Sequence, residues 1–195
     1  MNNTPVFSDL ETERLWLRQI DMAHKEDIFR QFSSAEVSRY LLDEEPFTSV
    51  QEAEGLISWY TEPLPRDHHR WVLLRKADGA FVGTCGFHRW DTDNNIAEIG
   101  YDLFPSCWGQ GYMNEALNAA IEHGFTAMGL NRIQAFVYPQ NQRSARLLQR
   151  LGFQKEGVFR DKHLFRGVYY DHLVFSLLRR EWREWRAEPM EKTHE

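Results

Sequence analysis

The sequence predicts an α+β domain built on a mostly antiparallel sheet, and three observations lead to that prediction. Runs of strand length with alternating apolar and polar residues recur between turn residues. Three such runs follow one another between residues 70 and 104 with only short turns, as in an antiparallel meander. A helical pattern over 114–128 then joins the strands at 96–104 and 131–139. Such a crossover places its two strands parallel.

The N-terminal third predicts one strand followed by helices. Glu13–Ile20 ("ERLWLRQI") alternates apolar and polar residues and predicts a strand. Asp21 is a suitable N-cap for a helix over 23–32. A second helical patch covers 35–42, and "TSVQEAEGLISWYTE" predicts a third helix that ends before Pro63.

The C-terminal part predicts a helix and a closing hairpin. "NQRSARLLQRLGF" predicts a helix that begins near Asn141 and ends at Gly152, a glycine suited to the left-handed position after a helix. "FQKEGVFRDKHLF" and "VYYDHLVFSLL", joined by Arg-Gly, predict the hairpin. The charged tail after it is expected to fray. We therefore expect one domain over 1–195, with its core at about 10–177 and a tail at 178–195.

Composition and charge exclude several classes of protein. The chain has 195 residues, of which 42% are hydrophobic, and this suits one domain with an ordinary core. Its net charge of −6 argues against general nucleic-acid binding, which needs a basic face. No apolar run reaches the roughly 20 residues of a membrane helix, and no signal peptide is evident. Cys85 and Cys107 form no CxxC pair. We expect a cytoplasmic protein without membrane or nucleic-acid partners.

Three histidines raise the question of a metal site. His68, His69 and His88 have no HxE, HExxH or cysteine pattern around them. Adjacent histidines on a strand also point to opposite faces. The sequence therefore predicts no metal.

The stretch "WGQGYM", at the start of the helix predicted over 114–128, is typical of a phosphate site. The first turn of a helix exposes unpaired backbone N–H groups and a partial positive charge. Glycines let a ligand approach the backbone closely. A Walker A loop is excluded because no Gly-Lys-Ser/Thr is present, and a dinucleotide loop is disfavoured because Asn114 stands where its third glycine belongs. A turn whose glycines serve only chain geometry is the remaining alternative.

Three segments together resemble one family. "FPSCWGQGYMNEAL" resembles motif A, Q/R-x-x-G-x-G/A, of the Gcn5-related N-acetyltransferase (GNAT) superfamily. Gly111 matches the motif, whereas Trp108 and Met113 depart from it. "LETERLWLRQI" and "NQRSARLLQRLGFQKEG" resemble the opening T-x-R-L-x-L-R and motif B of the RimJ/RimL branch. The three matches occur in the family's order and spacing.

The resemblance implies a GNAT-like fold and an acetyl-CoA site. In that fold the two parallel strands splay, and the pantetheine arm of acetyl-CoA lies between them. Tyr101 and Leu103 would offer backbone groups to that arm, and Asn141 would contact it or cap its own helix. Arg143 and Arg146 would face the phosphates or solvent. The pyrophosphate would be held by the backbone amides of Trp108, Gly109, Gln110, Gly111, Tyr112 and Met113.

The resemblance also implies an acetyl transfer in which an amine attacks the thioester directly within a ternary complex. Glu98, in the apolar run "IAEIGY", is the candidate general base, with an outward-facing surface glutamate as the alternative. Ser144 is a candidate acid near the sulfur or only a helix-start residue. An amide near Leu103 would stabilise the oxyanion.

The acceptor is left open by the sequence. The branch implies a primary amine, first of all the N-terminal amine of a protein such as a ribosomal protein. A polyamine, an antibiotic or an amino-acid conjugate is the alternative. A coenzyme A-binding protein without turnover and an NAD-binding redox module are further hypotheses. Both a monomer and a homodimer are compatible with the sequence.

Overall fold

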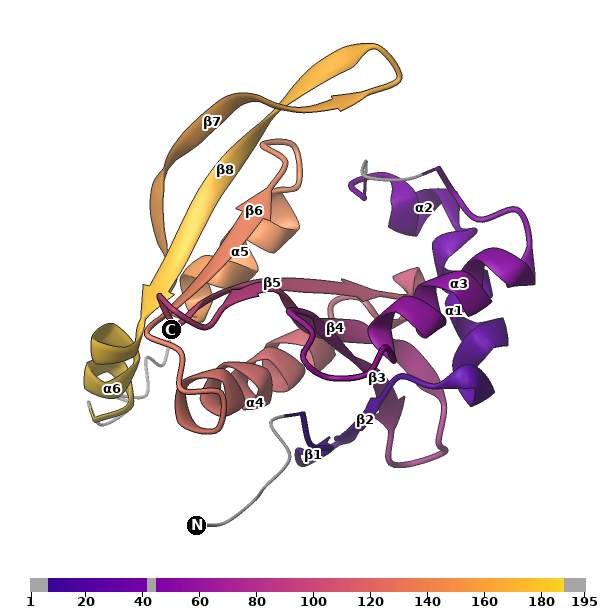
Figure 1. The fold of residues 1–195 in the computed structure, drawn as a ribbon, viewed down its shortest axis with the longest axis horizontal. Helices are drawn as coiled ribbons and strands as arrows, with labels where there is room; N and C mark the ends of the chain where they lie inside the picture. The colour runs from indigo at the N-terminus through magenta and orange to yellow at the C-terminus, as the bar shows by residue number, and fades with distance from the viewer. Residues whose placement is uncertain (1–6, 42–44, 188–195) are drawn as a thin grey trace.

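The fold is organised around one eight-stranded sheet (Figure 1). The computed structural model describes residues 7–41 and 45–187. The strands lie in the order β1-β2-β3-β4-β5-β6-β8-β7; all neighbours are antiparallel except β5 and β6, which are parallel. Their bounds are β1 Leu10–Glu11, β2 Leu15–Gln19, β3 His69–Arg75, β4 Phe81–Asp91, β5 Ile96–Leu103, β6 Arg132–Val137, β7 Gln154–Phe165 and β8 Val168–Leu178. The predicted meander, crossover and closing hairpin are confirmed.

The described residues form six α-helices and two short 3-10 helices. Their bounds are η1 Met22–His24, α1 Lys25–Phe32, α2 Ala35–Ser38, α3 Val50–Tyr60, η2 Pro105–Cys107, α4 Tyr112–Thr126, α5 Gln142–Arg150 and α6 Arg179–Ala187. Asp21 caps a helix as predicted, since its Oδ1 accepts a hydrogen bond from the Ala23 N–H at 2.8 Å, but that helix is η1, and His24 is the N-cap of α1. The helix predicted over 35–42 is shorter than expected, because the chain leaves α2 through a turn in which the Leu41 N–H donates to the Ser38 carbonyl. Residues 42–44 lie outside the described part.

The charged tail does not fray where it follows β8. It forms α6 instead, and the Trp182 ring packs against Phe125 of α4 with ring centroids 5.2 Å apart. The Arg179 guanidinium also donates to the Leu130 carbonyl at 2.6 Å. These contacts dock the helix, and the prediction of fraying was wrong for residues 179–187. Residues 188–195 lie outside the described part.

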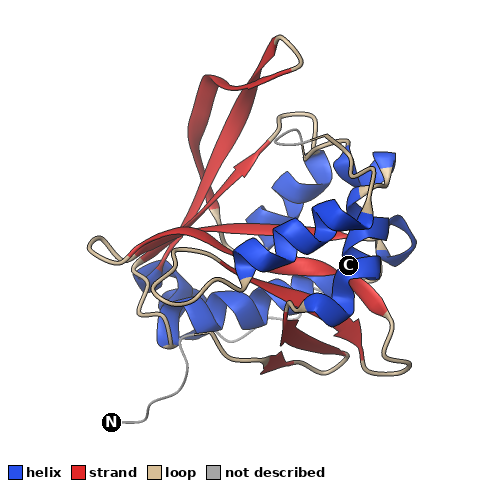
Figure 2. Cartoon of the chain, turned by 45° about the vertical axis from the view of Figure 1, so that its right-hand side comes forward, coloured by secondary structure: helices blue, strands red, loops and turns tan. Residues whose placement is uncertain are grey.

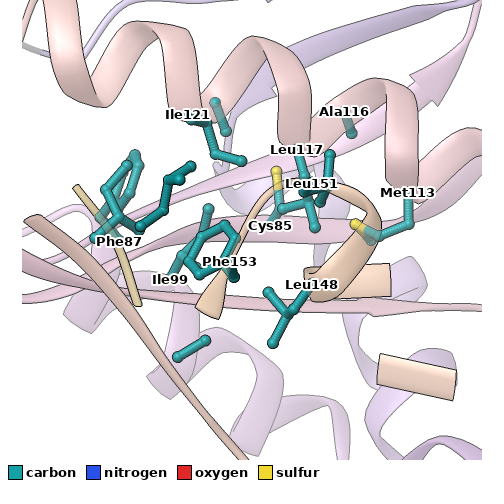
Figure 3. Close-up of a cluster of buried hydrophobic side chains, with 14 of the residues drawn as sticks. Cys85, Phe87, Ile99, Met113, Ala116, Leu117, Ile121, Leu148, Leu151 and Phe153 are labelled. Carbon is teal, nitrogen blue, oxygen red and sulfur yellow. The ribbon is translucent and has the colours of Figure 1, made fainter. Parts of the chain in front are cut away.

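Helices cover both faces of the sheet and form two hydrophobic cores (Figure 2). The larger core joins one sheet face to α4 and α5; Figure 3 shows Met113, Ala116, Leu117 and Ile121 of α4 facing Cys85, Phe87 and Ile99 of the strands. The smaller core joins Ile20 and Val72 to α1 and α3, through residues such as Ile28 and Ile57. This division leaves α1–α3 on one face and the glycine turn with α4 on the other.

The parallel pair β5 and β6 separates after a short contact. Pairing is limited to Ile96 with Arg132, Ala97 with Ile133 and Glu98 with Gln134. Beyond Glu98, β5 continues along β4 alone, while β6 stays paired with β8. The splay that the resemblance implied is therefore present, and it begins at Glu98 (Figure 1).

Candidate active site

The backbone of β5 faces the gap that β6 leaves. Just after β5, the Phe104 N–H donates to the Val82 carbonyl at 3.0 Å, so even-numbered residues of β5 bond to β4. Successive residues of an antiparallel ladder alternate in the direction of their polar groups. The backbone groups of Tyr101 and the N–H of Leu103 therefore point toward the gap; that they contact a pantetheine arm stays a prediction.

The glycine turn opens directly into α4. Gly109 and Gly111 have φ angles of +75° and +81°, in the left-handed region that glycine adopts without strain. Gly111 is the N-cap of α4 and makes no side-chain capping bond, so the first amides of the helix are not covered by a cap. A Cβ added at Gly109 would meet no atom within 4 Å, which indicates open space above the turn. This geometry fits a diphosphate group.

Two details of the predicted cradle differ in the structure. The helix starts at Tyr112, two residues earlier than predicted, because the left-handed Gly111 turns the chain directly into its first turn. The Trp108 amide donates to the Pro105 carbonyl at 3.1 Å, so it is not available to a phosphate, contrary to the prediction. Met113 departs from the family motif without harm, since its side chain is buried in the core at 6% exposure.

An N-terminal clamp holds the glycine turn, and the sequence analysis missed it. Thr12 and Arg14 both hydrogen-bond to Glu115 in the first turn of α4, at 2.5 and 2.6 Å. The Arg14 guanidinium also donates to the Gln110 carbonyl at 3.0 Å and stacks on Tyr112, 4.7 Å from the ring centroid. The signal was present in "TERL", because Thr12 and Arg14 are the residues that its T-x-R pattern specifies.

Trp108 acts through its side chain. Its indole Nε1 donates to the Leu103 carbonyl at 3.0 Å, tying the turn to the end of β5. The Arg143 guanidinium lies 4.9 Å from the centroid of the Trp108 ring. Arg143 thus lies beside the glycine turn, whereas Arg146 is an exposed residue of α5.

The start of α5 brings a second group of predicted residues to the gap. The Asn141 side chain caps the helix by accepting a hydrogen bond from the Ser144 N–H at 3.2 Å. The Ser144 hydroxyl lies 2.7 Å from the Tyr101 hydroxyl, across from β5 to α5. Burial raises the pKa of Tyr101, so this phenol is neutral. The capping role of Asn141 is thus present, and it holds Ser144 against the strand.

A cavity of about 760 Å³ lies beside the splay. Its walls come from α1–α3, from β3–β6, from the start of α5 and from the β7–β8 hairpin, and they include Glu98, Tyr101, Asn141 and Ser144. The Glu98 side chain is 20% exposed and accepts a hydrogen bond from the Arg89 guanidinium at 2.9 Å. Four of the predicted residues therefore line one cavity.

A buried ion pair forms part of the cavity wall, and sequence reasoning missed it. Arg70 of β3 and Asp102 of β5 pair there with side chains 9% and 5% exposed. Thr84 bonds to both, and Arg70 also donates to the Tyr60 hydroxyl at 3.1 Å. No local motif signals this pair, because its members lie 32 residues apart on strands that do not neighbour each other.

His68 and His88 line the aromatic wall of the cavity, whereas His69 packs against Phe7 and Trp71. His68 stacks on Trp59 with ring centroids 3.8 Å apart, and its Nε2 lies 2.7 Å from the Trp59 carbonyl oxygen. Burial lowers the pKa of His69 and of His88 to about 3, with nearby positive charge adding to the effect, so both are neutral. Within residues 7–41 and 45–187 no cluster of three or more His, Cys, Asp or Glu is placed to hold a metal.

In the same residues, no helix is long and apolar enough to cross a membrane.

Comparisons with known proteins agree with this geometry. The profile described as "Acetyltransferase (GNAT) domain" matches residues 14–154. The N-acetyltransferase p20 of Bacillus licheniformis is 40% identical over 174 residues, which is 89% of this chain and 97% of that protein. The [ribosomal protein uS5]-alanine N-acetyltransferase of Escherichia coli is 40% identical over 84 residues, 43% of each chain.

A solved structure shares the fold. The spermidine N-acetyltransferase of Vibrio cholerae, in complex with CoA and spermine, superposes with a TM-score of 0.78 at 22% identity, over 87% of this chain and 98% of that one. Enzymes of the GNAT type use acetyl-CoA, and the splayed strands, the glycine turn and the profile match coincide in this chain. The protein belongs to the GNAT family of N-acetyltransferases.

Proposed function

We propose that this protein transfers the acetyl group of acetyl-CoA to the N-terminal amine of another protein, by direct attack within a ternary complex. The observation that carries the proposal is the position of Glu98. It is the last residue of β5 that pairs with β6, and it lines the cavity. The Glu98 carboxylate therefore lies where the gap between β5 and β6 meets the acceptor cavity. An attacking amine must lose its proton at this point.

The chain's own residues divide the work of transfer. The first amides of α4 and the backbone of Tyr101 and Leu103 bind and aim acetyl-CoA, which supplies the activated acetyl group. Glu98 takes a proton from the amine, directly or through water. Proton transfer of this kind contributes about 10²- to 10⁴-fold in rate. The N–H groups of Tyr101 and Leu103 face the gap, and that of Tyr101 is the candidate donor to the developing oxyanion, because Leu103 lies about 16 Å from Glu98 along β5.

Amine chemistry favours a protein N-terminus. An α-amino group has a pKa of about 7.7–8.0, whereas an alkyl amine such as that of lysine has a pKa of about 10.4. At neutral pH a much larger share of the α-amine is therefore unprotonated. Glu98 is a single carboxylate that is already paired with Arg89. It is therefore better suited to take a proton from the α-amine, which is the less basic of the two amines.

The charges of the cavity also disfavour a polyamine. Four carboxylates line it among the described residues, and each already contacts a basic side chain. The pairs are Glu45–Arg166, Asp67–His68, Glu98–Arg89 and Asp102–Arg70. A polycation would have to compete with these basic side chains for several carboxylates, whereas an acceptor with one amine on an apolar body needs Glu98 alone. The rings of Phe32, Trp59 and Tyr60 offer that body an apolar wall.

The partial match to the uS5-alanine N-acetyltransferase is consistent with a protein acceptor, since that enzyme acts on an alanine of ribosomal protein uS5, as its name states. A small amine is a second candidate. The cavity volume of about 760 Å³ falls in the range of roughly 300–1,000 Å³ that is typical of small-molecule sites. Size alone would therefore admit such an acceptor.

The test is free-thiol release from acetyl-CoA across a panel of amines. The panel contains a hexapeptide with a free N-terminal alanine, the same peptide blocked at its N-terminus, spermidine, and a monoamine such as tyramine. We expect the free peptide to give the highest kcat/KM and the blocked peptide to give none. Preference for spermidine or tyramine would overturn the proposed acceptor. Saturable acetyl-CoA binding with no turnover on any amine would instead support the non-catalytic alternative.

A further inference from the structure

We propose that Tyr101 is a positioning residue: its hydroxyl donates to the Ser144 oxygen and thereby turns the Ser144 hydrogen toward the sulfur of the bound acyl carrier. The inference rests on the proposed function, because it assigns a task to a contact within that site. Tyr101 enters the family resemblance only through its backbone. The resemblance assigns no role to its side chain, which hydrogen-bonds to Ser144 in the structure.

The contact joins β5 directly to the start of α5 at the edge of the cavity. The two hydroxyl oxygens lie 2.7 Å apart, one on β5 beyond the last pairing with β6, the other on α5. Both residues line the cavity. The Asn141 side chain fixes the Ser144 backbone at 3.2 Å, so the serine is held at both its backbone and its side chain.

The direction of the hydrogen bond follows from what each group can do. A hydroxyl carries one hydrogen and two acceptor sites. If Tyr101 donates, Ser144 keeps its own hydrogen for a third partner. If Ser144 donated to Tyr101 instead, the serine hydrogen would be used in that bond and could not reach a ligand in the cavity. The first arrangement gives the cavity a donor whose orientation is set by a neutral, half-buried phenol.

Tyr101 does not act as the acid. Burial raises its pKa above the ordinary value of about 10, whereas an ordinary thiol has a pKa of about 8.5. A proton would therefore not pass from this phenol to a leaving thiolate. When the amine nitrogen bonds to the carbonyl carbon, the C–S bond breaks and its electron pair stays on sulfur. Ser144 then hydrogen-bonds to that thiolate, and the amine proton goes to Glu98.

The test combines turnover with a titration that needs no turnover. The variants are Tyr101→Phe, Ser144→Ala, the double variant, and Ser144→Thr, which keeps a hydroxyl. With acetyl-CoA and the alanine hexapeptide, we expect each of the first two to lower kcat roughly tenfold, as for the loss of one hydrogen bond to a charged group, with KM for acetyl-CoA nearly unchanged. The double variant should be no worse than Ser144→Ala, and Ser144→Thr should restore most of the rate.

The second arm follows the ultraviolet absorbance of the thiolate of bound CoA as a function of pH. We expect the thiol pKa of CoA to be lower on the wild-type protein than on Tyr101→Phe or Ser144→Ala, by about one unit. Equal thiol pKa values on all three proteins, or additive losses of kcat in the double variant, would overturn the inference. If the wild-type protein turned over no amine, the proposed function would fail, yet the titration would still decide the role of Tyr101.

Discussion

The two ends of the site are built in different ways. The acyl-carrier end consists of backbone groups: the β5 ladder, the left-handed glycines and the first turn of α4. The acceptor end consists of side chains from α1–α3, four strands and the far hairpin. A site built from backbone groups needs glycines and turns in a fixed local order, so it can be recognised in the amino-acid sequence. A pocket built from side chains of distant segments has no such local sequence pattern.

Because of this difference, amino-acid substitutions should affect the two ends of the site in different ways. A substitution at the acyl-carrier end acts on backbone conformation, whereas one at the acceptor end acts on charges that are already paired. Five predictions test the contrast, ordered by the size of the effect that we expect.

The largest effect should come from the buried ion pair of the acceptor end. Arg70→Met leaves Asp102 in the cavity wall without its counter-charge. Removing one partner of a buried pair destabilises a protein by about 3–5 kcal/mol. We expect a loss of that size in the free energy of unfolding, measured by urea denaturation. The double variant Arg70→Met/Asp102→Leu should recover much of it, and a double variant as unstable as the single one would contradict this account.

Glu98→Gln should have the next largest effect, and it acts on rate. The amide keeps the shape of the side chain but cannot accept a proton, so kcat with the best acceptor should fall about 10²-fold or more. Folding should change little, because Arg89, its partner, has a side chain that is 70% exposed. Arg89→Gln is the matched control: it breaks the same pair but keeps the carboxylate, and its loss of kcat should be much smaller. Full activity of Glu98→Gln at neutral pH would exclude Glu98 as the base.

Acid should destabilise the protein through two buried histidines. The pKa values of His69 and His88 are about 3 in the folded state and about 6.5 when unfolded. The unfolded chain therefore binds more protons between these values, so stability is complete above about pH 6.5 and falls as the pH drops toward 3. Each histidine contributes roughly 2 kcal/mol of loss between pH 6.5 and 5.

The measurement is the free energy of unfolding at several pH values from 7 to 5. His88→Gln removes one of the two groups, so the slope of stability against pH should fall by about one proton relative to the wild-type protein. An unchanged slope would mean that His88 already takes up a proton in the folded state.

The residues in the first three predictions also illustrate which features of the molecule can be predicted from the sequence and which cannot. Sequence reasoning placed the strands, the β5–β6 crossover and the glycine turn correctly, because each depends on local periodicity or turn residues, whereas the role of Glu98 stays a prediction. It missed the Arg70–Asp102 pair, which depends on three strands meeting side by side, and it missed α6. The pattern around Trp182 is mostly charged, and its docking depends on Phe125, 57 residues earlier in the sequence.

A smaller effect should appear at the acyl-carrier end. Gly111→Ala places a Cβ in the left-handed region, 3.3 Å from the Arg14 guanidinium. The backbone strain is worth roughly 1–2 kcal/mol. If the turn opens to relieve it, the affinity for acetyl-CoA should fall about tenfold by calorimetry. Gly79→Ala is the matched control, with φ of +72° and no atom within 4 Å of the added Cβ, in the turn between β3 and β4. It should carry the same strain with unchanged affinity.

The smallest effect should come from the exposed ion pair at the mouth of the acceptor cavity. Arg166, in the turn between β7 and β8, pairs with Glu45 before α3, and the two side chains are 65% and 58% exposed. Such pairs are weak and screened by salt. Arg166→Gln should therefore hardly change KM for the alanine peptide. It leaves Glu45 unpaired at the cavity, however, so KM for spermidine should fall about two- to threefold at low salt, and this gain should vanish in high salt. Arg18→Gln, which breaks an exposed pair with Asp9 outside the cavity, should show no such gain. A spermidine KM that does not respond to Arg166→Gln would mean that paired carboxylates are not what excludes polycations from this pocket.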